Sequence, residues 1–291
     1  MTGKIIKGVA GFYYVYTESC KEVECRARGI FRNRNEKPLV GDNVELEILD
    51  EKTGTGNITR LLKRRNELIR PAAANIDQAA VIFAAACPAP NRGLLDRFLI
   101  MMERENIKTI ICINKCDLEE KTAAWLKQIY TGAGYEVLIM SMVTGAGIAR
   151  LKELLQGRTT ILAGPSGVGK STLTNQIQPG AGMETGQVSE KIQRGRHTTR
   201  HTEIIPVDEE TFLLDTPGFS SLYLPDMDKE ELKEYFPEFA PYAGQCRFGG
   251  CAHLEEPDCA VKKAAGIGLI GAERYESYRQ MYEELKNKKR Y

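Results

Sequence analysis

The sequence predicts three successive domains: an all-β barrel, a doubly wound α/β domain, and a helical domain built around a cluster of cysteine and histidine. Three observations predict this order. Short alternating apolar segments fill residues 1–70, strand and helix patterns alternate over residues 71–221, and three of the eight cysteines lie close to a histidine within residues 222–291. With 291 residues, of which 42% are apolar, the chain can bury the cores of several domains.

The N-terminal region has the pattern of a small barrel. Alternating segments with the sequences IIKGVAGFYYVY, EVECRARGIF, NVELEI and NITRLL are separated by Gly, Asn, Asp and Pro. About five strands in this length favour an OB-type barrel, a fold often used to bind RNA. A β domain without a ligand would show the same pattern, so both alternatives stay open. The basic stretch RLLKRR at the end of the barrel is weak evidence for RNA, because a solvated strand edge looks the same.

The middle region has the alternating periodicity of an α/β domain. The expected strands are AAVIFAAA, KTIICIN, YEVLIMS, TTILAG, TEIIPV and TFLLD. The expected helices are GLLDRFLIMMEREN, TAAWLKQIYTGAG, GIARLKELLQG and KSTLTNQI. Ligands of doubly wound domains bind at the carboxyl ends of the strands, so motifs that directly follow a strand are the candidates for a site.

The segment GPSGVGKS is a candidate phosphate-binding loop. It fits G-x-x-x-x-G-K-[ST] and lies between an apolar strand and a helix, as that motif requires. Its glycines let backbone N–H groups surround phosphate oxygens, and the helix N-terminus adds partial positive charge. Lys170 supplies a cation to the β- and γ-phosphates, and Ser171 supplies a hydroxyl to Mg²⁺. The predicted residues of this loop are Gly164, Pro165, Ser166, Gly167, Val168, Gly169, Lys170, Ser171 and Thr172.

The stretch NKCD, directly after the strand TIICI, is a candidate reader of a guanine base. The Asp117 carboxylate can accept hydrogen bonds from the ring N–H and the exocyclic amine of guanine, a donor pair that adenine lacks. Paired hydrogen bonds discriminate strongly because the wrong base leaves a buried group unpaired. Asn114 would brace the neighbouring loops, and the stem of Lys115 would pack along the base. Ser141, in SMVTG after the next strand, would steady the base from its other side.

Two further stretches would complete a nucleotide site. DTPG ends the strand TFLLD, where the Asp215 carboxylate can hold Mg²⁺ through water and the Gly218 N–H can bond the γ-phosphate. The polar stretch KIQRGRHTTR, between the phosphate loop and DTPG, is suited to a switch that senses the γ-phosphate. There Thr198 or Thr199 could reach Mg²⁺ when the triphosphate is bound.

The sequence also offers a candidate for positioning an attacking water. The place after the DTPG glycine, where many nucleotide hydrolases carry a glutamine, holds Phe219, which cannot orient water. Two of the three histidines, His197 and His201, lie in the predicted switch, where a histidine such as His197 could position the water, with Lys170 as the catalytic cation. The alternative is that His197 only forms hydrogen bonds within its own loop.

The C-terminal region contains four candidate metal ligands. CRFGGCAHLEEPDC places three cysteines and one histidine in a loop-rich segment, as C-x4-C-x-H-x5-C. Three thiolates and one imidazole make a closed tetrahedral Zn²⁺ site with no position for water, which favours a structural zinc. The alternative is a group of buried reduced cysteines, but clustered soft ligands in a cytosolic chain usually indicate metal. The predicted ligands are Cys246, Cys251, His253 and Cys259.

The order of these motifs along the chain is similar to that of a known class of proteins. The base reader comes first, followed by SMVTG, the glycine loop, GRHTT and DTPG. This order is similar to that of the circularly permuted GTPases. With a barrel before it and a Cys/His domain behind it, the chain closely resembles the bacterial family of small-ribosomal-subunit-dependent GTPase A. Chain ends in α/β domains often lie close together, so joining them and opening the chain elsewhere keeps the site while changing the motif order.

The resemblance implies a GTP hydrolase with an OB-type barrel, a circularly permuted α/β P-loop GTPase domain and a C-terminal helical zinc-binding domain. It implies GTP/GDP, magnesium and one structural zinc as ligands, with His197 and the Cys/His spacing at the family's positions. The implied partner is the 30S ribosomal subunit, bound through 16S rRNA during late maturation, which stimulates slow intrinsic hydrolysis. Because the Cys/His domain follows DTPG directly, we expect hydrolysis to reposition it.

Two other classes of function stay open on sequence grounds. The loop GPSGVGKST also resembles that of guanylate kinase, so a nucleotide kinase with a zinc lid is one rival, although NKCD and DTPG argue against it. The other rival is an RNA-binding assembly scaffold that does not hydrolyse its nucleotide.

Composition restricts the location and the partners. The net charge is only +1, so RNA contacts must come from local patches such as RLLKRR, KIQRGRH and NKKR. The longest apolar run, AAVIFAAAC, is too short to span a bilayer, and the N-terminus lacks the apolar region of a signal peptide. We therefore expect a cytoplasmic chain without a membrane partner, and we expect a monomer.

Overall fold

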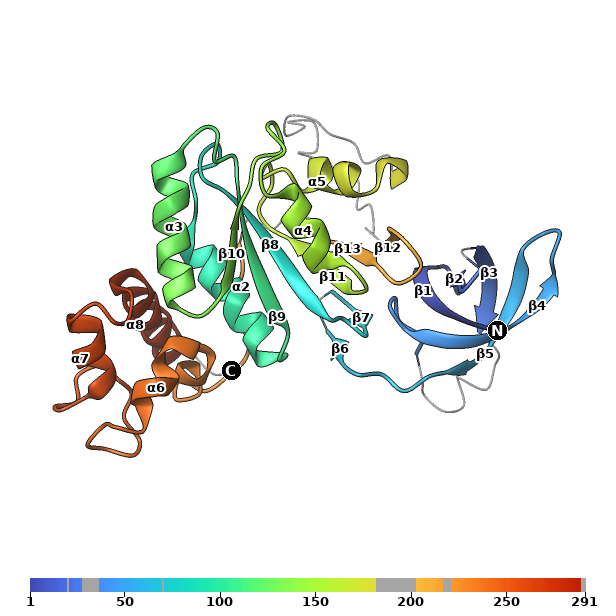
Figure 1. The fold of residues 1–291 in the computed structure, drawn as a ribbon. Helices are drawn as coiled ribbons and strands as arrows, with labels where there is room; N and C mark the ends of the chain where they lie inside the picture. The colour runs from blue at the N-terminus through green and yellow to red at the C-terminus, as the bar shows by residue number, and fades with distance from the viewer. Residues whose placement is uncertain (20, 28–36, 70, 182–202, 217–220, 289–291) are drawn as a thin grey trace, which may run out of the picture. The chain divides into compact units, whose positions relative to one another are not determined.

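The computed structural model describes the chain except residues 20, 28–36, 70, 182–202, 217–220 and 289–291 (Figure 1). Its contacts form two compact units. The first contains Met1–Ala80 and Ile148–Gly218, and the second contains Val81–Gly147 and Phe219–Tyr291. These units do not define domain boundaries, so the boundaries at residues 70 and 221 stay predictions. Among the described residues, no helix is both long and apolar enough to cross a membrane.

The first unit begins with a closed barrel. Its strands are β1 (Thr2–Val9), β2 (Phe12–Thr17), β3 (Glu22–Ala27), β4 (Asn43–Asp50) and β5 (Thr55–Leu61). They follow the order β1-β2-β3-β5-β4, and β4 pairs with β1 to close the barrel. The apolar side chains of these alternating strands meet inside and form a core. Its residues are Ile5, Val15, Val23, Cys25, Val44, Leu46 and Ile58. The predicted OB-type barrel is confirmed.

One cation of the barrel, the ammonium group of Lys4, is partly shielded from solvent. Lys4 of β1 is half-buried, and its ammonium nitrogen lies 5.3 Å from the centre of the Phe212 ring. Burial lowers the pKa of Lys4 from 10.5 to about 8, although the carboxylates of Asp77 and Asp42 act in the opposite direction. The folded chain therefore carries a charge at neutral pH that its surroundings disfavour.

Replacing Lys4 by methionine is expected to stabilise the chain at neutral pH by about 1 kcal/mol, since the side chain is only half-buried. Between about pH 8 and 10.5, the unfolded chain binds a proton that the folded chain has released, so wild-type stability should rise with pH across this window. The Lys4→Met variant lacks this rise and should lose its advantage as the pH approaches 10.5. Urea unfolding of both chains at the two ends of the window measures the difference. An advantage that does not change with pH would contradict this reasoning.

The rest of the first unit carries the predicted phosphate loop. Its helices are α4 (Ile148–Leu155), α5 (Lys170–Ile177) and the 3-10 turn η1 (Pro179–Ala181). Its strands are β6 (Glu67–Leu68), β7 (Ala73–Ala74), the start of β8 (Gln78–Ala84), β11 (Thr159–Ala163), β12 (Glu203–Pro206) and β13 (Phe212–Asp215). β11 and β13 are parallel, and β12 runs antiparallel to β13. β8 starts beside β11, where the N–H of Asp77 donates to the carbonyl oxygen of Thr159 at 2.9 Å.

The second unit carries the predicted base reader. Its first elements are the remainder of β8, then α2 (Arg92–Arg104), β9 (Lys108–Asn114), α3 (Glu120–Gly132) and β10 (Glu136–Ile139). β9 lies between β8 and β10 and pairs in parallel with β10. β8 and β9 are almost wholly buried, as expected for parallel strands flanked by helices such as α2 and α3 (Figure 1). The alternation of strands and helices predicted for this region is confirmed.

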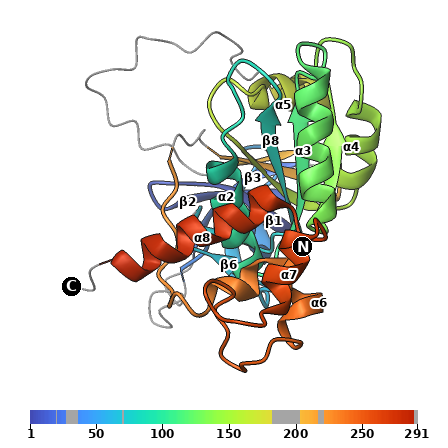
Figure 2. The same cartoon turned by 90° about the vertical axis from the view of Figure 1, so that its left-hand side faces the viewer.

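The second unit ends in a helical segment with its own core (orange to red in Figure 2). Its elements are the 3-10 turns η3 (Leu232–Tyr235) and η4 (Pro237–Phe239), and the helices α6 (Ala240–Ala243), α7 (Ala260–Gly266) and α8 (Ala272–Asn287). Its core also includes Ile100 of α2, so this segment packs on the α/β part of its unit. The other core residues are Leu224, Leu232, Phe236, Phe239, Cys251, Cys259, Val261, Ala264, Ile270, Tyr278, Met281, Tyr282 and Leu285.

A buried ion network fastens this segment to α2 and α3. Arg274 of α8 is 1% exposed, and its Nε donates to Glu238 Oε1 at 2.7 Å. Its Nη1 donates to Asp96 Oδ1 at 2.6 Å, and the same oxygen accepts from the Tyr130 hydroxyl at 3.0 Å. The guanidinium carbon lies 4.5 Å from the centre of the Phe236 ring. One cation therefore serves two buried carboxylates that come from α2 and η4.

Replacing Arg274 by methionine is expected to destabilise the second unit by about 3–5 kcal/mol, because it leaves two buried carboxylates without their cation. The only tryptophan, Trp125, reports on this region, since its Nε1 donates to Glu273 Oε1 at 3.2 Å. Urea unfolding followed by its fluorescence measures the loss. The matched control is Arg279→Met on the same helix, where an exposed guanidinium lies 3.6 Å from Glu276 and removal should change stability by less than about 0.5 kcal/mol. Equal effects of the two substitutions would contradict the prediction.

Candidate nucleotide and metal sites

The predicted phosphate loop lies between β11 and α5. Gly164, Gly167 and Gly169 have φ angles of 147°, 78° and 104°, in the region that favours glycine. Lys170 is the first residue of α5, and its Nζ donates to the carbonyl oxygens of Gly164 and Pro165, at 2.8 Å each. The ammonium group therefore lies inside the curve of the loop that carries it, as a phosphate-binding lysine requires.

The remaining residues of the loop include one that is buried in the core and others that are accessible to solvent. Val168 is 1% exposed and fixes the loop to the core, while Ser166 and Gly167 are exposed. Ser171 and Thr172 are half-buried in the first turn of α5, where side chains and free N–H groups lie at the positive end of the helix. This arrangement is the one expected of an anion-binding loop.

The predicted magnesium carboxylate lies beside this loop. β13 pairs in parallel with β11 so that Asp215 is opposite Leu162, two residues before Gly164. The Thr216 hydroxyl donates to the carbonyl oxygen of Leu162 at 2.8 Å and holds the strand end in place. Burial lowers the pKa of Lys170, while the nearby Asp215 carboxylate raises it. The structure thus brings Asp215 and Lys170 together within the first unit.

The predicted base reader lies at the end of β9 in the second unit. Asn114 is 2% exposed, and its Oδ1 accepts from the N–H of Met142 at 3.2 Å, so it braces the loop after β10 as expected. Lys115 has a φ of 61°, and its Nζ donates to the carbonyl oxygen of Cys87. Asp117 is exposed on the turn that follows. Its carboxylate is therefore accessible to a base.

The loop after β10 is held by Ser141. This residue is fully buried, and its Oγ accepts from the N–H groups of Val143 and Thr144 at 3.2 and 3.1 Å. NKCD and SMVTG are therefore connected by a hydrogen bond within the second unit. The contact of Lys115 with Cys87 was not foreseen, because a backbone carbonyl leaves no residue-specific signal in a sequence.

Several predicted residues cannot be placed. His197, Thr198, Thr199, Gly218 and Phe219 lie outside the described residues. The phosphate side of the predicted site belongs to the first unit and the base side to the second. Binding of a single nucleotide by both sides therefore stays a prediction.

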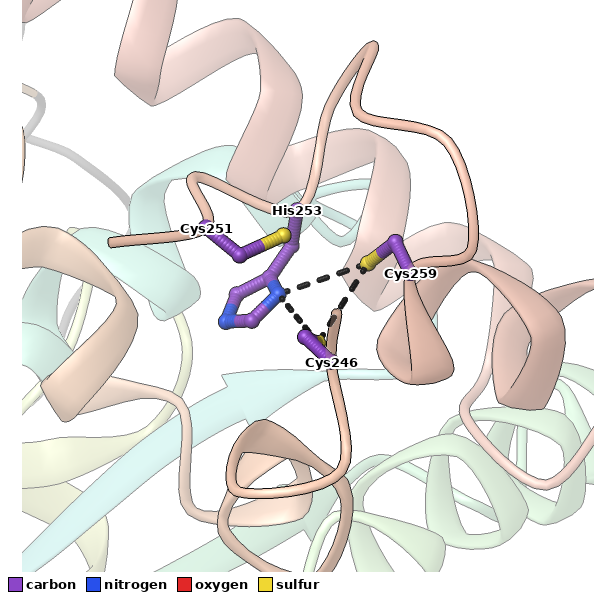
Figure 3. A group of neighbouring side chains, drawn as sticks. All are labelled: Cys246, Cys251, His253 and Cys259. Carbon is purple, nitrogen blue, oxygen red and sulfur yellow. Dashed lines mark hydrogen bonds between the residues drawn. The ribbon is translucent and has the colours of Figure 1, made fainter. Parts of the chain in front are cut away.

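The four predicted metal ligands come together in the C-terminal segment (Figure 3). The ligand atoms of Cys246, Cys251, His253 and Cys259 all lie within 4.8 Å of one another. The Nδ1 of His253 faces the sulfurs of Cys246 and Cys259, at 3.5 and 3.4 Å, and these sulfurs are 3.8 Å apart. Three sulfurs and one imidazole nitrogen at these separations fit a tetrahedral Zn²⁺ ion.

Contacts of the surrounding backbone shape this cluster. The Glu256 carboxylate accepts from the N–H groups of Ala252 and Leu254, at 2.6 and 2.9 Å, and so closes the turn that carries His253. The hydroxyls of Tyr275 and Tyr278 donate to the carbonyl oxygens of His253 and Ala252, at 2.7 and 2.6 Å. The sequence analysis did not single out Glu256, although a carboxylate three residues beyond a candidate ligand was a usable signal.

The protonation behaviour of Cys246 and His253 suits a metal, whereas that of Cys251 opposes formation of its thiolate. Burial raises the pKa of the Cys246 thiol, but hydrogen bonds from the N–H groups of Ala260 and Val261, together with those to the thiols of Cys259 and Cys251, lower the pKa overall. Burial and the neighbouring thiols raise the pKa of Cys251. Burial lowers the pKa of His253, which keeps its ring neutral. A neutral imidazole and an easily formed thiolate are the states that bind zinc, so this cluster could hold the ion.

Two solved structures share this architecture over the whole chain. The crystal structure of YjeQ from Thermotoga maritima matches with a TM-score of 0.84 and 36% identity, and 99% of each chain is covered. The crystal structure of YloQ, described as a circularly permuted GTPase, matches with a TM-score of 0.80 and 40% identity over 100% of this chain and 96% of its own. These matches show the fold of a circularly permuted GTPase, and the predicted base reader precedes the predicted phosphate loop in the chain, as expected for that class.

The chain belongs to the RsgA GTPase family, because the model of the RsgA GTPase family matches residues 61–225 and that of the RsgA N-terminal domain matches residues 2–55. The small ribosomal subunit biogenesis GTPase RsgA of Agathobacter rectalis is 54% identical over 302 residues, with 100% of both sequences covered. As a member of a GTPase family, the chain hydrolyses GTP to GDP and phosphate, with Mg²⁺ as the implied ion. This membership does not favour the nucleotide kinase.

Proposed function

We propose that this GTPase acts in the late maturation of the 30S ribosomal subunit, that it binds 16S rRNA, and that the subunit stimulates its hydrolysis of GTP. The observation that carries the proposal is 54% identity, over the whole chain, to a protein named small ribosomal subunit biogenesis GTPase RsgA. The closed OB-type barrel supports contact with RNA, because this fold presents a strand face and loops to oligonucleotides. A factor of this kind works in the cytoplasm, and we propose that it acts as a monomer.

The domain organisation is part of the proposal. We assign residues 1–70 to RNA binding, residues 71–221 to GTP, and residues 222–291 to a zinc-binding helical domain. One structural zinc would be held by the four ligands of the Cys/His cluster, which lies within the core of the C-terminal segment.

The first unit would hold the phosphates and the magnesium. Lys170 would place its charge on the β- and γ-phosphates, and the N–H groups of residues 164–172 would surround their oxygens. Ser171 would bind Mg²⁺ directly, and Asp215 would bind it through water, helped by Thr198 or Thr199. The ion, when bound, neutralises charge that develops on the phosphate oxygens. The N–H of Gly218 would sense the γ-phosphate.

The second unit would read the base. Its exposed Asp117 would accept from both guanine donors, and buried Asn114 would keep the two loops in register. The stem of Lys115 would cover one face of the base, and the backbone held by Ser141 would steady it. Recognition by a pair of hydrogen bonds would give a preference for GTP over ATP.

His197→Ala is expected to lower subunit-stimulated GTP turnover about 100-fold, the scale of a lost positioned acid or base, with GTP affinity nearly unchanged. The reason is that His197 would orient water in place of the glutamine that Phe219 replaces. His201→Ala, in the same stretch, is the matched control. Stimulated rates equal to wild type would reject the role of His197.

The decisive experiment is GTP turnover with and without purified small ribosomal subunits. We expect slow hydrolysis alone and a large stimulation by the subunits. Turnover that no subunit preparation stimulates would reject the proposed function. Tight subunit binding without any hydrolysis would point to the scaffold, and conversion of GMP plus ATP to GDP would point to the kinase.

A further inference from the structure

The barrel contacts the hairpin that carries Asp215. Strand β1 pairs antiparallel with β12, with Lys7 opposite Glu203, and the Lys7 ammonium lies 3.1 Å from the Glu203 carboxylate. At the other end of the hairpin, the Phe212 ring contacts Lys4 and meets the ring of Tyr16 edge-on at 5.9 Å. The barrel therefore covers an edge of β12 that would otherwise have unpaired backbone groups.

A bulge in β1 places both lysines on the side that faces this hairpin. The register of β1 against β2 shifts between Ile5 and Lys7, so Ile6 is an extra residue without a partner of its own. In a regular strand, Lys4 and Lys7 would point to opposite faces. The extra residue brings them to the same face, which is a usual effect of a bulge.

One row of paired residues leads from the barrel to the phosphate site. Lys7 is opposite Glu203, Glu203 is opposite Asp215, and Asp215 is opposite Leu162, which precedes Gly164 by two residues. Directly opposite residues lie on the same face, with Cβ atoms about 5 Å apart. The carboxylate of Glu203 is therefore the cross-strand neighbour of the carboxylate of Asp215.

Two carboxylates in such positions repel each other, which would displace one of them unless a cation holds it. We propose that Lys7 and Glu203 are positioning residues for Asp215: Lys7 draws the Glu203 carboxylate toward the barrel and so leaves Asp215 directed at magnesium. This inference rests on the proposed function in one respect, the role of Asp215 as a magnesium carboxylate. The pair of Lys7 and Glu203 would then connect the barrel to the hydrolytic site, because a ligand that moves β1 would also move Glu203, the neighbour of Asp215.

The test is the Mg²⁺ dependence of unstimulated GTP turnover by the full chain. Lys7→Glu is expected to raise the half-saturating Mg²⁺ concentration about three- to tenfold, the size of effect expected for reversing one exposed ion pair. The direction of the shift is decisive. An added negative charge acting only through its field would attract the cation and lower this concentration, whereas displacement of Asp215 raises it. A lowered or unchanged requirement overturns the proposal.

Substitutions at two lysine positions serve as controls. Lys7→Arg keeps the ion pair and should keep the wild-type Mg²⁺ profile. Lys108→Glu disrupts a comparable exposed pair, in which the lysine lies 3.3 Å from Glu136 in the second unit, and should also leave the profile unchanged. An equal rise in Lys108→Glu would overturn the proposal.

Asp215→Asn separates the inference from its premise. If Asp215→Asn leaves the Mg²⁺ profile unchanged, the proposed role of Asp215 fails and the inference fails with it. If Asp215→Asn raises the requirement and Lys7→Glu does not, only the inference fails. Hydrogen exchange gives a second readout: Lys7→Glu should speed exchange in β12 and β13 and not in β9 and β10, and uniform exchange rates would overturn the proposal.

Discussion

Removal of zinc from the chain is expected to unfold the C-terminal segment while the phosphate loop continues to bind GTP. Cys251 and Cys259 are each 2% exposed and belong to the core that α7 and α8 share with α2. Without the ion, the thiols of buried Cys251 and Cys259, the half-buried thiol of Cys246 and the buried imidazole of His253 would lose their common partner, and within the described residues the Nε2 of His253 has no hydrogen-bond partner. Binding energies of structural zinc, about 10–16 kcal/mol in small domains, exceed the stability of a segment this small.

Hydrogen exchange with and without a chelator measures this effect. Protection should be lost in α7 and α8, partly lost in α2 because Ile100 is in the same core, and kept in β11 and α5. GTP affinity should change by less than about tenfold, because no residue of the phosphate loop belongs to that core. Cys259→Ser should reproduce the loss, and Cys87→Ser, an exposed cysteine outside the cluster, should not. Full protection of α8 in the metal-free chain would contradict a structural zinc.

The sequence could predict those parts of the site whose residues all lie within one short segment of the chain. Positive φ angles at Gly164, Gly167 and Gly169 follow from local turns that other residues rarely adopt, so the loop and its sequence pattern are inseparable. The Cys/His cluster is similar, because 14 residues contain all four ligands. The closed barrel follows from alternation and strand number, since an open sheet of that size would expose its apolar face.

The contacts that join distant segments left no local signal. Lys7 and Glu203 are 196 positions apart, and Arg274 and Asp96 are 178 apart. An alternating strand does not reveal that Ile6 forms a bulge, so the shared face of Lys4 and Lys7 could not be predicted.

The burial of Arg274 did have a usable signal. The helix AERYESYRQMYEELKN is highly charged and reads as exposed. Its buried residues are Arg274, Ser277, Tyr278, Met281, Tyr282 and Leu285. They recur at steps of three or four, so the arginine lies on the apolar face of a helix, where a charge needs a buried partner.

Asp117→Asn is expected to convert the chain from a guanine to a xanthine nucleotide binder. A carboxylate offers two acceptors to the two donors of guanine, whereas an amide offers one acceptor and one donor. One donor of guanine would then face the NH2 group of the amide, and GTP affinity should fall about 1,000-fold or more. Xanthine has a carbonyl oxygen where guanine has its amine, so it complements the amide. Competition binding with GTP, XTP and ATP measures the change.

The exposed position of Asp117 makes this prediction specific. The brace of the loop is Asn114, which is buried, so the substitution changes the base contact without removing a support of the fold. Glu120→Gln, an exposed carboxylate in the first turn of α3, is the matched control and should leave all three affinities unchanged. A parallel loss of GTP and XTP would show damage to the loop rather than altered reading. An unchanged affinity for GTP would place the base elsewhere, and the two units would then not share one nucleotide.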